Sequence, residues 1–277
     1  MFDRATSDSR ARSDKSAEKN VDLEKPPFVA TVTFPDYDQN TPFGSAILTD
    51  RPLAAKEQEQ LKKVTTPDAA WSLLKPLGGR ILLAAPYFGP PSDSGGLDKR
   101  GMIQNFYLNL NSDRNSGLTI NDLKAVVDEC YTPSAKAVVV FPLQGEEARK
   151  GLLWDIGGGQ PRGPYIPELG EEQGNLYFPQ HAIDLGNGQA NMALLAQSFN
   201  FSRTCEWHIK ASYTDTSGAH TKRIPDGRKK FTSEAVPPNP DQFFIHYPGM
   251  KWMCGGQVVR SNCEFKSSQE WGFRDET

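Results

Sequence analysis

Cys205-Glu206-Trp207-His208-Ile209-Lys210-Ala211-Ser212-Tyr213 is the stretch that decides the fold class of the C-terminal half. Apolar or small residues alternate with polar ones at every position. Side chains of a strand point alternately to its two faces, so this pattern predicts a strand with one buried and one solvated face. Turn-forming residues follow at 214–218, and residues 220–224 can return as the second strand of a hairpin.

The N-terminal half carries alternating strand and helix signals. Strands are predicted for the short apolar runs at residues 28–34, 45–49, 80–87, 102–110 and 137–141. Asp50 can cap a helix that runs to residue 64. Thr66-Pro67 is a stronger start signal, because threonine caps a helix and proline suits its first turn, and this second helix is expected to end at Gly78-Gly79.

A third helix is predicted over residues 118–131. The i, i+3, i+4, i+7 spacing that places side chains on one helix face is found at Leu123, Val126, Val127 and Cys130. The expected elements of the second half are a short helix at 190–197, strands at 176–185 and 243–247, and a hairpin around Gly255-Gly256.

Together these signals predict an α+β fold. Its N-terminal part is an α/β layer of mixed sheet with about three helices, and its C-terminal half is antiparallel and β-rich. A Gly/Pro-rich stretch after residue 154 suggests a boundary. We therefore expect a flexible charged tail at 1–25, an α/β domain at 26–150 and a β-rich domain at 151–277, with one continuous domain as the alternative.

Composition sets broad limits on function. A chain of 277 residues with 37% hydrophobic residues can bury a sizeable core. The net charge of −3 provides no global field that would hold nucleic acid or an anionic membrane. No apolar signal region opens the chain, and no stretch approaches the ~20 apolar residues of a membrane span. We expect a protein of the cytoplasm or of an assembled particle, with no signal peptide and no membrane contact.

The four cysteines are Cys130, Cys205, Cys254 and Cys263. Without a secretion signal, thiols are the default state, and Cys205 and Cys254 are expected to be small core residues. A Cys254–Cys263 disulfide is the alternative for a protein that is exported or sits in a particle. The spacing of this pair does not match a zinc finger or ribbon, so neither a metal nor a cofactor is expected.

Signals of catalysis are weak. Residues 92–96, Ser-Asp-Ser-Gly-Gly, resemble the signature around the nucleophile of chymotrypsin-like proteases. In that family the catalytic histidine precedes the serine, whereas all four histidines here follow residue 180. A hydrolase-type site could instead be assembled near the domain junction at 150–190 from Asp155, His181 and Asp184, with Arg162 nearby.

A basic hairpin is the remaining binding candidate. Five cationic residues surround the turn at residues 225–227, namely Lys222, Arg223, Arg228, Lys229 and Lys230. Such a tip can hold phosphate groups or nucleic acid. We favour the alternative, in which the charges protect a strand edge from pairing with other sheets, because the nearby Trp207 and Tyr213 have the inward parity and are unavailable to stack on bases.

Two classes of function remain. The first is a non-enzymatic interaction or structural protein that engages a protein partner or its own copies through the N-terminal arm and the β-rich half. The second is a hydrolase-type enzyme with its site near residues 150–190. The lack of a catalytic triad order, a metal spacing and a nucleotide loop in the sequence favours the first.

Overall fold

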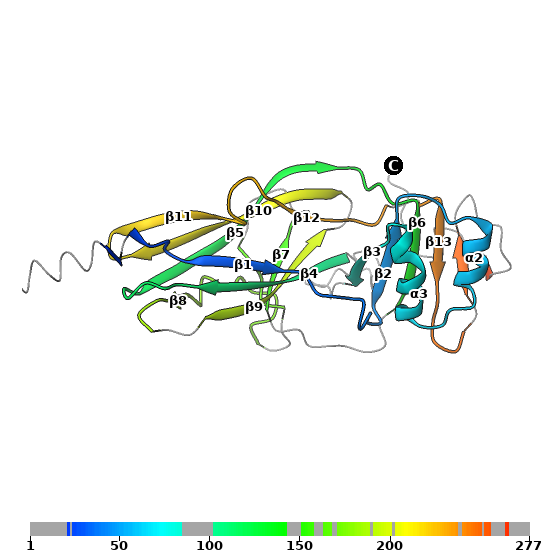
Figure 1. Ribbon diagram of the computed structural model, residues 1–277, viewed down its shortest axis with the longest axis horizontal. Helices are drawn as coiled ribbons and strands as arrows, with labels where there is room; N and C mark the ends of the chain where they lie inside the picture. The colour runs from blue at the N-terminus through cyan, green and yellow to red at the C-terminus, as the bar shows by residue number, and fades with distance from the viewer. Residues whose placement is uncertain are drawn as a thin grey trace, which may run out of the picture.

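The computed structural model describes residues 21–22, 24–84, 102–142, 151–157, 163–167, 171–188, 191–200, 203–237, 240–250, 252–255 and 264–265. Of the described residues, 47% lie in strands and 11% in helices, so the helices form a minor layer on a β structure. The described part is elongated, with the helices at one end and the first described residues at the other (Figure 1).

Two sheets build this structure. The larger sheet contains β1 (Val29–Thr33), β2 (Ser45–Thr49), β3 (Arg80–Ala84), β4 (Met102–Asn111), β6 (Ala137–Phe141), β7 (Leu152–Asp155), β9 (Met192–Asn200), β13 (Gln242–Ile245), β14 (Met253–Gly255) and β15 (Glu264–Phe265). The smaller sheet contains β5 (Leu118–Tyr131), β8 (Ile183–Leu185), β10 (Thr204–Asp215), β11 (Gly218–Ile224) and β12 (Phe231–Ser233).

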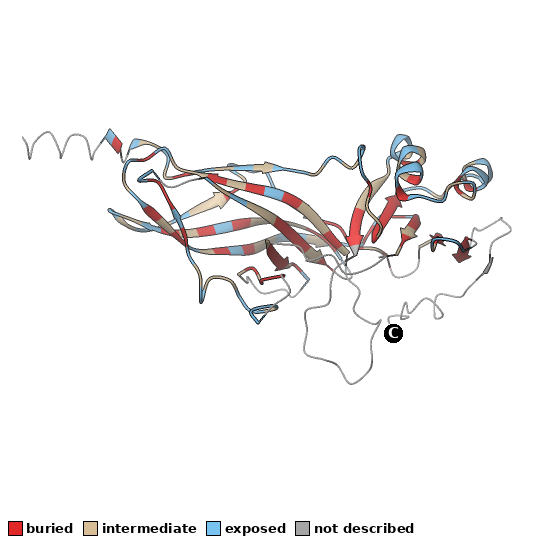
Figure 2. Cartoon of the chain, turned by 90° about the horizontal axis from the view of Figure 1, so that it is seen from below, coloured by how far each residue is buried: buried red, intermediate tan, exposed pale blue. Residues whose placement is uncertain are grey.

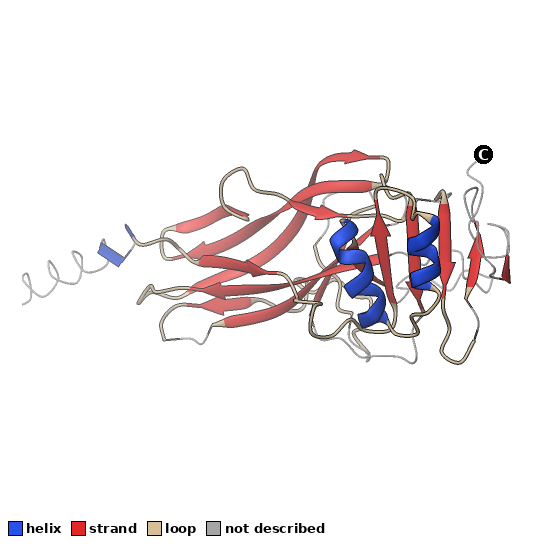
Figure 3. Cartoon of the chain, turned by 45° about the vertical axis from the view of Figure 1, so that its right-hand side comes forward, coloured by secondary structure: helices blue, strands red, loops and turns tan. Residues whose placement is uncertain are grey.

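The larger sheet is covered differently at its two ends. At one end, α2 (Ala55–Leu61) and α3 (Pro67–Leu74) lie on one face (Figure 3) and pack on side chains of β2, β6 and β13. At the other end, β1, β4, β7 and β9 face the smaller sheet and form a β-sandwich. Its core is aromatic, built around Phe106, Trp154, Trp207 and Phe231, and Phe106 and Phe231 stack with ring centroids 4.7 Å apart.

Strand pairs join the two halves of the sequence. β9 pairs with β4, β10 with β5, and β13 runs parallel to β6, so each pair crosses residue 150. These pairs run across the boundary expected near residue 150, and the division into domains stays a prediction. Residues 1–20 lie outside the described residues. Asp22, however, is buried, which does not fit its place in the flexible tail predicted for residues 1–25.

The helix predicted over 118–131 is wrong, because this segment is the long strand β5. Two bulges interrupt its pairing with β10, since Asn121 and Asp128 are each an extra residue with no partner in the register. The inward side chains therefore fall at positions 118, 120, 123, 125, 127 and 130. Of the residues on which the helix prediction rested, Leu123, Val127 and Cys130 are inward, and the bulge gives them a spacing that resembles a helical repeat, whereas Val126 lies opposite His208 on the outer face.

The short helix predicted at 190–197 is also a strand, β9. Its sequence, Met-Ala-Leu-Leu-Ala-Gln, is rich in good helix formers. It nevertheless lies between two strands, antiparallel to β4 over nine residue pairs and parallel to β7. Hydrogen bonds to β4 and β7, one on each side of β9, outweigh the helix propensity of its residues. In the segment predicted as a strand at 176–185, only β8 and a single bridge at Leu176 are β structure.

Other local predictions are confirmed. β10 buries the predicted face, with Cys205, Trp207 and Ile209 at 1% exposure or less, and β11 returns as its hairpin partner. Figure 2 shows the alternation of buried and exposed residues along the sandwich strands. The Thr66 hydroxyl caps α3 by accepting from the Ala69 N–H at 3.4 Å. The cap predicted at Asp50 is wrong, because α2 begins after Ala54, and the Asp50 carboxylate instead accepts from the Arg80 guanidinium at 2.7 and 2.8 Å.

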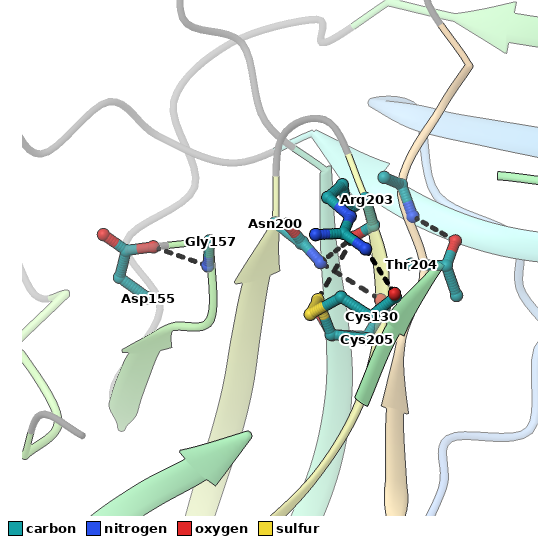
Figure 4. The surroundings of a disulfide bond; sticks show 9 residues. Cys130, Asp155, Gly157, Asn200, Arg203, Thr204 and Cys205 are labelled. Atoms are coloured by element: carbon teal, nitrogen blue, oxygen red, sulfur yellow. Dashed lines mark hydrogen bonds between the residues drawn. A yellow bond between two sulfur atoms is a disulfide. The ribbon is translucent and has the colours of Figure 1, made fainter. Parts of the chain in front are cut away.

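The thiol state expected for the cysteines is wrong as well. Cys130 and Cys205 face each other in the register of β5 and β10 and form a disulfide (Figure 4). The bulge at Asp128 makes this possible, because regular alternation through residues 127–130, with Asp128 paired, would point Cys130 to the outer face. Cys254 is also disulfide-bonded. Cys263, the partner that the sequence offers, lies outside the described residues, as do the end of the hairpin predicted around Gly255-Gly256 and residues 92–96.

We predict that replacing both Cys130 and Cys205 with serine destabilises the fold by about 4 kcal/mol, since the bond closes a chain segment of 75 residues. Urea unfolding under non-reducing conditions measures this loss. The Cys130→Ser single variant should lose a similar amount, because it removes the same bond. An unchanged free energy of unfolding would show that strand pairing alone restrains this part of the chain.

Candidate functional site

The first described residues of the chain are held at the far end of the sandwich from the helices (Figure 1). The Asp22 carboxylate accepts hydrogen bonds from the Asn115 N–H at 2.8 Å and from the Ser116 N–H and hydroxyl at 2.9 and 2.6 Å. The pKa of Asp22 is lowered to about 2, chiefly by the Ser116 hydroxyl. The loop between β4 and β5 thus binds one carboxylate of the N-terminal arm.

A buried ion pair lies beside this contact. Arg114 and Asp215 meet at 2.7 Å, and their side chains are only 6% and 3% exposed. The Arg114 guanidinium also donates to the Lys25 carbonyl at 2.7 and 3.1 Å. Burial alone would raise the pKa of Asp215, but hydrogen bonds from Ser217 and Arg114 bring it down to about 2. We call this set (Asp22, Lys25, Arg114, Ser116 and Asp215) the clasp.

The clasp continues into a Ser, His and Asp group that does not have the geometry of a catalytic triad. In a triad, the serine and the aspartate bind opposite nitrogens of the imidazole. Here the Ser217 hydroxyl and the Asp215 carboxylate both contact Nε2 of His220, at 2.9 and 3.2 Å. The Ser217 hydroxyl also donates directly to Asp215 at 2.6 Å. These contacts lock the tight turn between β10 and β11.

After the clasp the chain forms β1, an edge strand. Among the described strands, β1 pairs only with β4, with Thr31 opposite Asn109 at the centre of five residue pairs. The strand contains no charged residue. Large apolar side chains lie exposed on it and beside it, with exposed fractions of 47% for Val29, 60% for Phe34 and 47% for Tyr107. We call Val29, Thr31, Thr33, Phe34 and Tyr107 the β1 surface.

The predicted hydrolase residues are not brought together. Asp155 accepts from the Gly157 N–H at 3.0 Å, close to its own position in the chain (Figure 4). His181 contacts Glu172 at 3.2 Å and lies against the Tyr177 ring, whereas Asp184 accepts from the Thr119 hydroxyl at 2.6 Å. No interaction joins these three residues in the described part of the chain, and Arg162 lies outside it.

The basic residues of the hairpin are mostly directed to partners within the chain. Lys222 donates to the Phe28 carbonyl at 2.9 Å, across the edge of the sandwich. Arg223 contacts Asp128 at 3.4 Å, and Lys230 pairs with Glu206 at 2.6 Å. Arg228 and Lys229 are exposed. An inward-pointing lysine on an edge strand blocks further pairing, so this arrangement is compatible with edge protection, and a phosphate site stays a prediction.

Among the described residues, no helix has the length and apolar character needed to cross a membrane. Within the same residues, no group of three or more histidine, cysteine, aspartate or glutamate side chains is placed to hold a metal ion.

Comparison with known proteins adds no functional information. The sequence matches no protein-family profile and no curated protein.

We predict that Arg114→Met destabilises the fold by about 3–5 kcal/mol, because it leaves the buried Asp215 carboxylate without its cation. Arg51→Met is the matched control. It removes an exposed ion pair to Glu57 and should cost at most about 1 kcal/mol. Urea unfolding of both variants measures the difference, and equal losses would contradict the buried pairing.

The clasp should also make stability depend on acidity. The pKa values of Asp22 and Asp215 are lowered to about 2 from 3.8, so their stabilisation is complete above about pH 4 and is lost as the pH falls towards 2. Asp22→Asn should flatten the fall of the unfolding free energy between pH 4 and pH 2.5. Asp226→Asn, at an exposed position, should keep the slope of the native protein.

Proposed function

We propose that this chain is a non-enzymatic interaction protein that binds a protein partner, and in the first place further copies of itself, through its N-terminal arm and β-rich half. The observation that carries the proposal is the β1 surface, where an uncharged edge strand exposes Val29 and has two more exposed large apolar side chains, Phe34 and Tyr107, beside it. Edge strands of monomeric proteins are commonly protected by charges, prolines or bulges, because their free backbone groups can pair with another chain.

Two edge strands of the sandwich, β11 and β1, differ in whether they carry charged residues. β11, the edge of the smaller sheet, carries His220, Lys222 and Arg223. β1 carries only valine, alanine and threonine. An edge that is protected in one sheet and unprotected in the other supports a role for β1 in binding. Strand addition at such an edge supplies main-chain hydrogen bonds, and exposed side chains supply specificity.

The disulfide bears on where binding takes place. Disulfides persist in oxidising compartments and are rare in the cytoplasm, where thiols are kept reduced. The bond between Cys130 and Cys205 therefore favours an oxidising site of action, such as an exported particle, over the cytoplasm that the sequence suggested. Alkylation of the native protein before and after reduction tests this, and free thiols before reduction would argue for the cytoplasm.

Light scattering behind size exclusion tests the proposal on the full chain. We expect particles heavier than the 30.7 kDa of one chain, and we expect the double variant Phe34→Lys, Tyr107→Lys to be monomeric, because it puts charges on the β1 surface. Near-UV circular dichroism checks that the variant is folded.

Met250→Lys is the control for added charge at an exposed apolar residue, since Met250 is 65% exposed and follows β13 rather than β1. It should assemble like the native chain. A native protein that is monomeric at every concentration would rule out the proposed self-association. Assembly that is unaffected by the double variant would place the interface elsewhere.

A further inference from the structure

The start of the chain is bound by the rest of the molecule much as a separate peptide would be. We call Asp22 together with residues 24–33 the N-terminal segment. Its Phe28 side chain is fully buried and meets the Tyr213 ring edge-on at 5.6 Å. Lys222 holds the Phe28 carbonyl at 2.9 Å, and its ammonium lies 5.2 Å from the centre of the Phe28 ring. The segment therefore inserts one aromatic anchor between the two sheets.

Further contacts fix the segment along its whole length. β1 forms five residue pairs with β4. The Ser112 hydroxyl donates to the Pro27 carbonyl at 2.6 Å, and the clasp holds Asp22 and the Lys25 carbonyl. All of these partners lie on β4, β10, β11 and the loop between β4 and β5. They form an acceptor site that recognises a carboxylate, an apolar ring and an extended backbone in sequence.

The chain beyond this segment is anchored separately. Asp38 accepts from the Trp71 indole at 2.8 Å and pairs with Lys75, and the Thr41 N–H binds Asp68. All three partners belong to α3 and the residue that follows it. Tyr37 also belongs to the anchored part, because it is partly buried against the cluster of Leu83, Ile103 and Leu153. Only residues 34–36 therefore lie between the two anchored parts, and both Phe34 and Asp36 are exposed. These three residues form a short hinge that can connect the acceptor site of one molecule to the helices of another.

We infer that the acceptor site also takes the N-terminal segment of a second copy of this chain, so that two copies exchange their first strands. The inference rests on the proposed function and names its partner. Exchange keeps every contact of the segment, because the acceptor sites are identical, and only the hinge changes. In the exchanged dimer the two hinges lie close together. They would then cover Phe34 and Tyr107, the apolar side chains that a single copy leaves exposed at this point.

Cross-linking between two full-length variants tests the exchange. Thr31 of β1 lies opposite Asn109 of β4, so Thr31→Cys and Asn109→Cys meet only if one strand occupies the other molecule's site. The two proteins are mixed, unfolded, refolded together and treated with a short bis-maleimide. Among the described residues no cysteine is free, so the reagent reports on the introduced thiols. We expect a covalent dimer that contains one copy of each variant.

Two controls sharpen the result. Thr31→Cys mixed with Thr221→Cys should give no covalent dimer, because Thr221 is exposed on β11, in the opposite sheet. Four Gly/Ser residues inserted after Pro35 should lower the yield of cross-linked dimer several-fold, because a longer hinge lets each strand return to its own molecule.

The outcomes separate this inference from the proposed function. A single chain that carries both Thr31→Cys and Asn109→Cys shows whether the reagent spans these two positions within one molecule. If this chain cross-links within itself and the mixed single variants give no covalent dimer, strand exchange is overturned. Light scattering can then still find that the native chain is oligomeric and that the double variant Phe34→Lys, Tyr107→Lys is monomeric. In that case the chain assembles through the β1 surface without exchanging strands. A native chain that is monomeric throughout overturns both.

Discussion

The antiparallel pairing of β5 with β10 is the interaction on which the rest of this structure depends. It runs through eleven residue pairs and forms the centre of the smaller sheet. Its inner face supplies Leu123 and Trp207 to the aromatic core, and one of its ends carries the Cys130–Cys205 disulfide. At the opposite end, β10 delivers Asp215 to the clasp. The pairing therefore connects the end of the sandwich that carries the disulfide to the end where the clasp holds Asp22 and Lys25.

Elements that carry their own local signal could be predicted from the sequence. β10 alternates from Cys205 to Tyr213, α3 has a threonine cap and a proline, and β6 is a short apolar run. β5 and β9 could not. The bulges of β5 are set by its partner strand, and β9 is a strand because it has neighbours on both edges. Both causes are tertiary, so no window along the sequence contains them.

The candidate site was predicted only in outline. The N-terminal arm was expected to matter, but the clasp joins positions near 22, 114 and 215, which only the strand register brings together. The polar turn at 215–218 is the one local signal that marked its place. Conversely, the predicted hydrolase residues each had the right chemistry and were close in sequence. Their side chains are nevertheless satisfied by separate local partners, as with Asp155 and the Gly157 N–H.

The bulge at Asp128 has a consequence for sequence divergence. Asp128 is the residue without a register partner, so a chain that lacked it would show regular alternation from Ala125 to Tyr131 and would still place Cys130 opposite Cys205. The loss would be confined to the contacts of Asp128 with His208 and Arg223 on the outer face. Two sequences with this fold can therefore differ by one residue within β5 and still share the disulfide. An alignment that forbids gaps inside strands would then fail to align their cysteines at position 130.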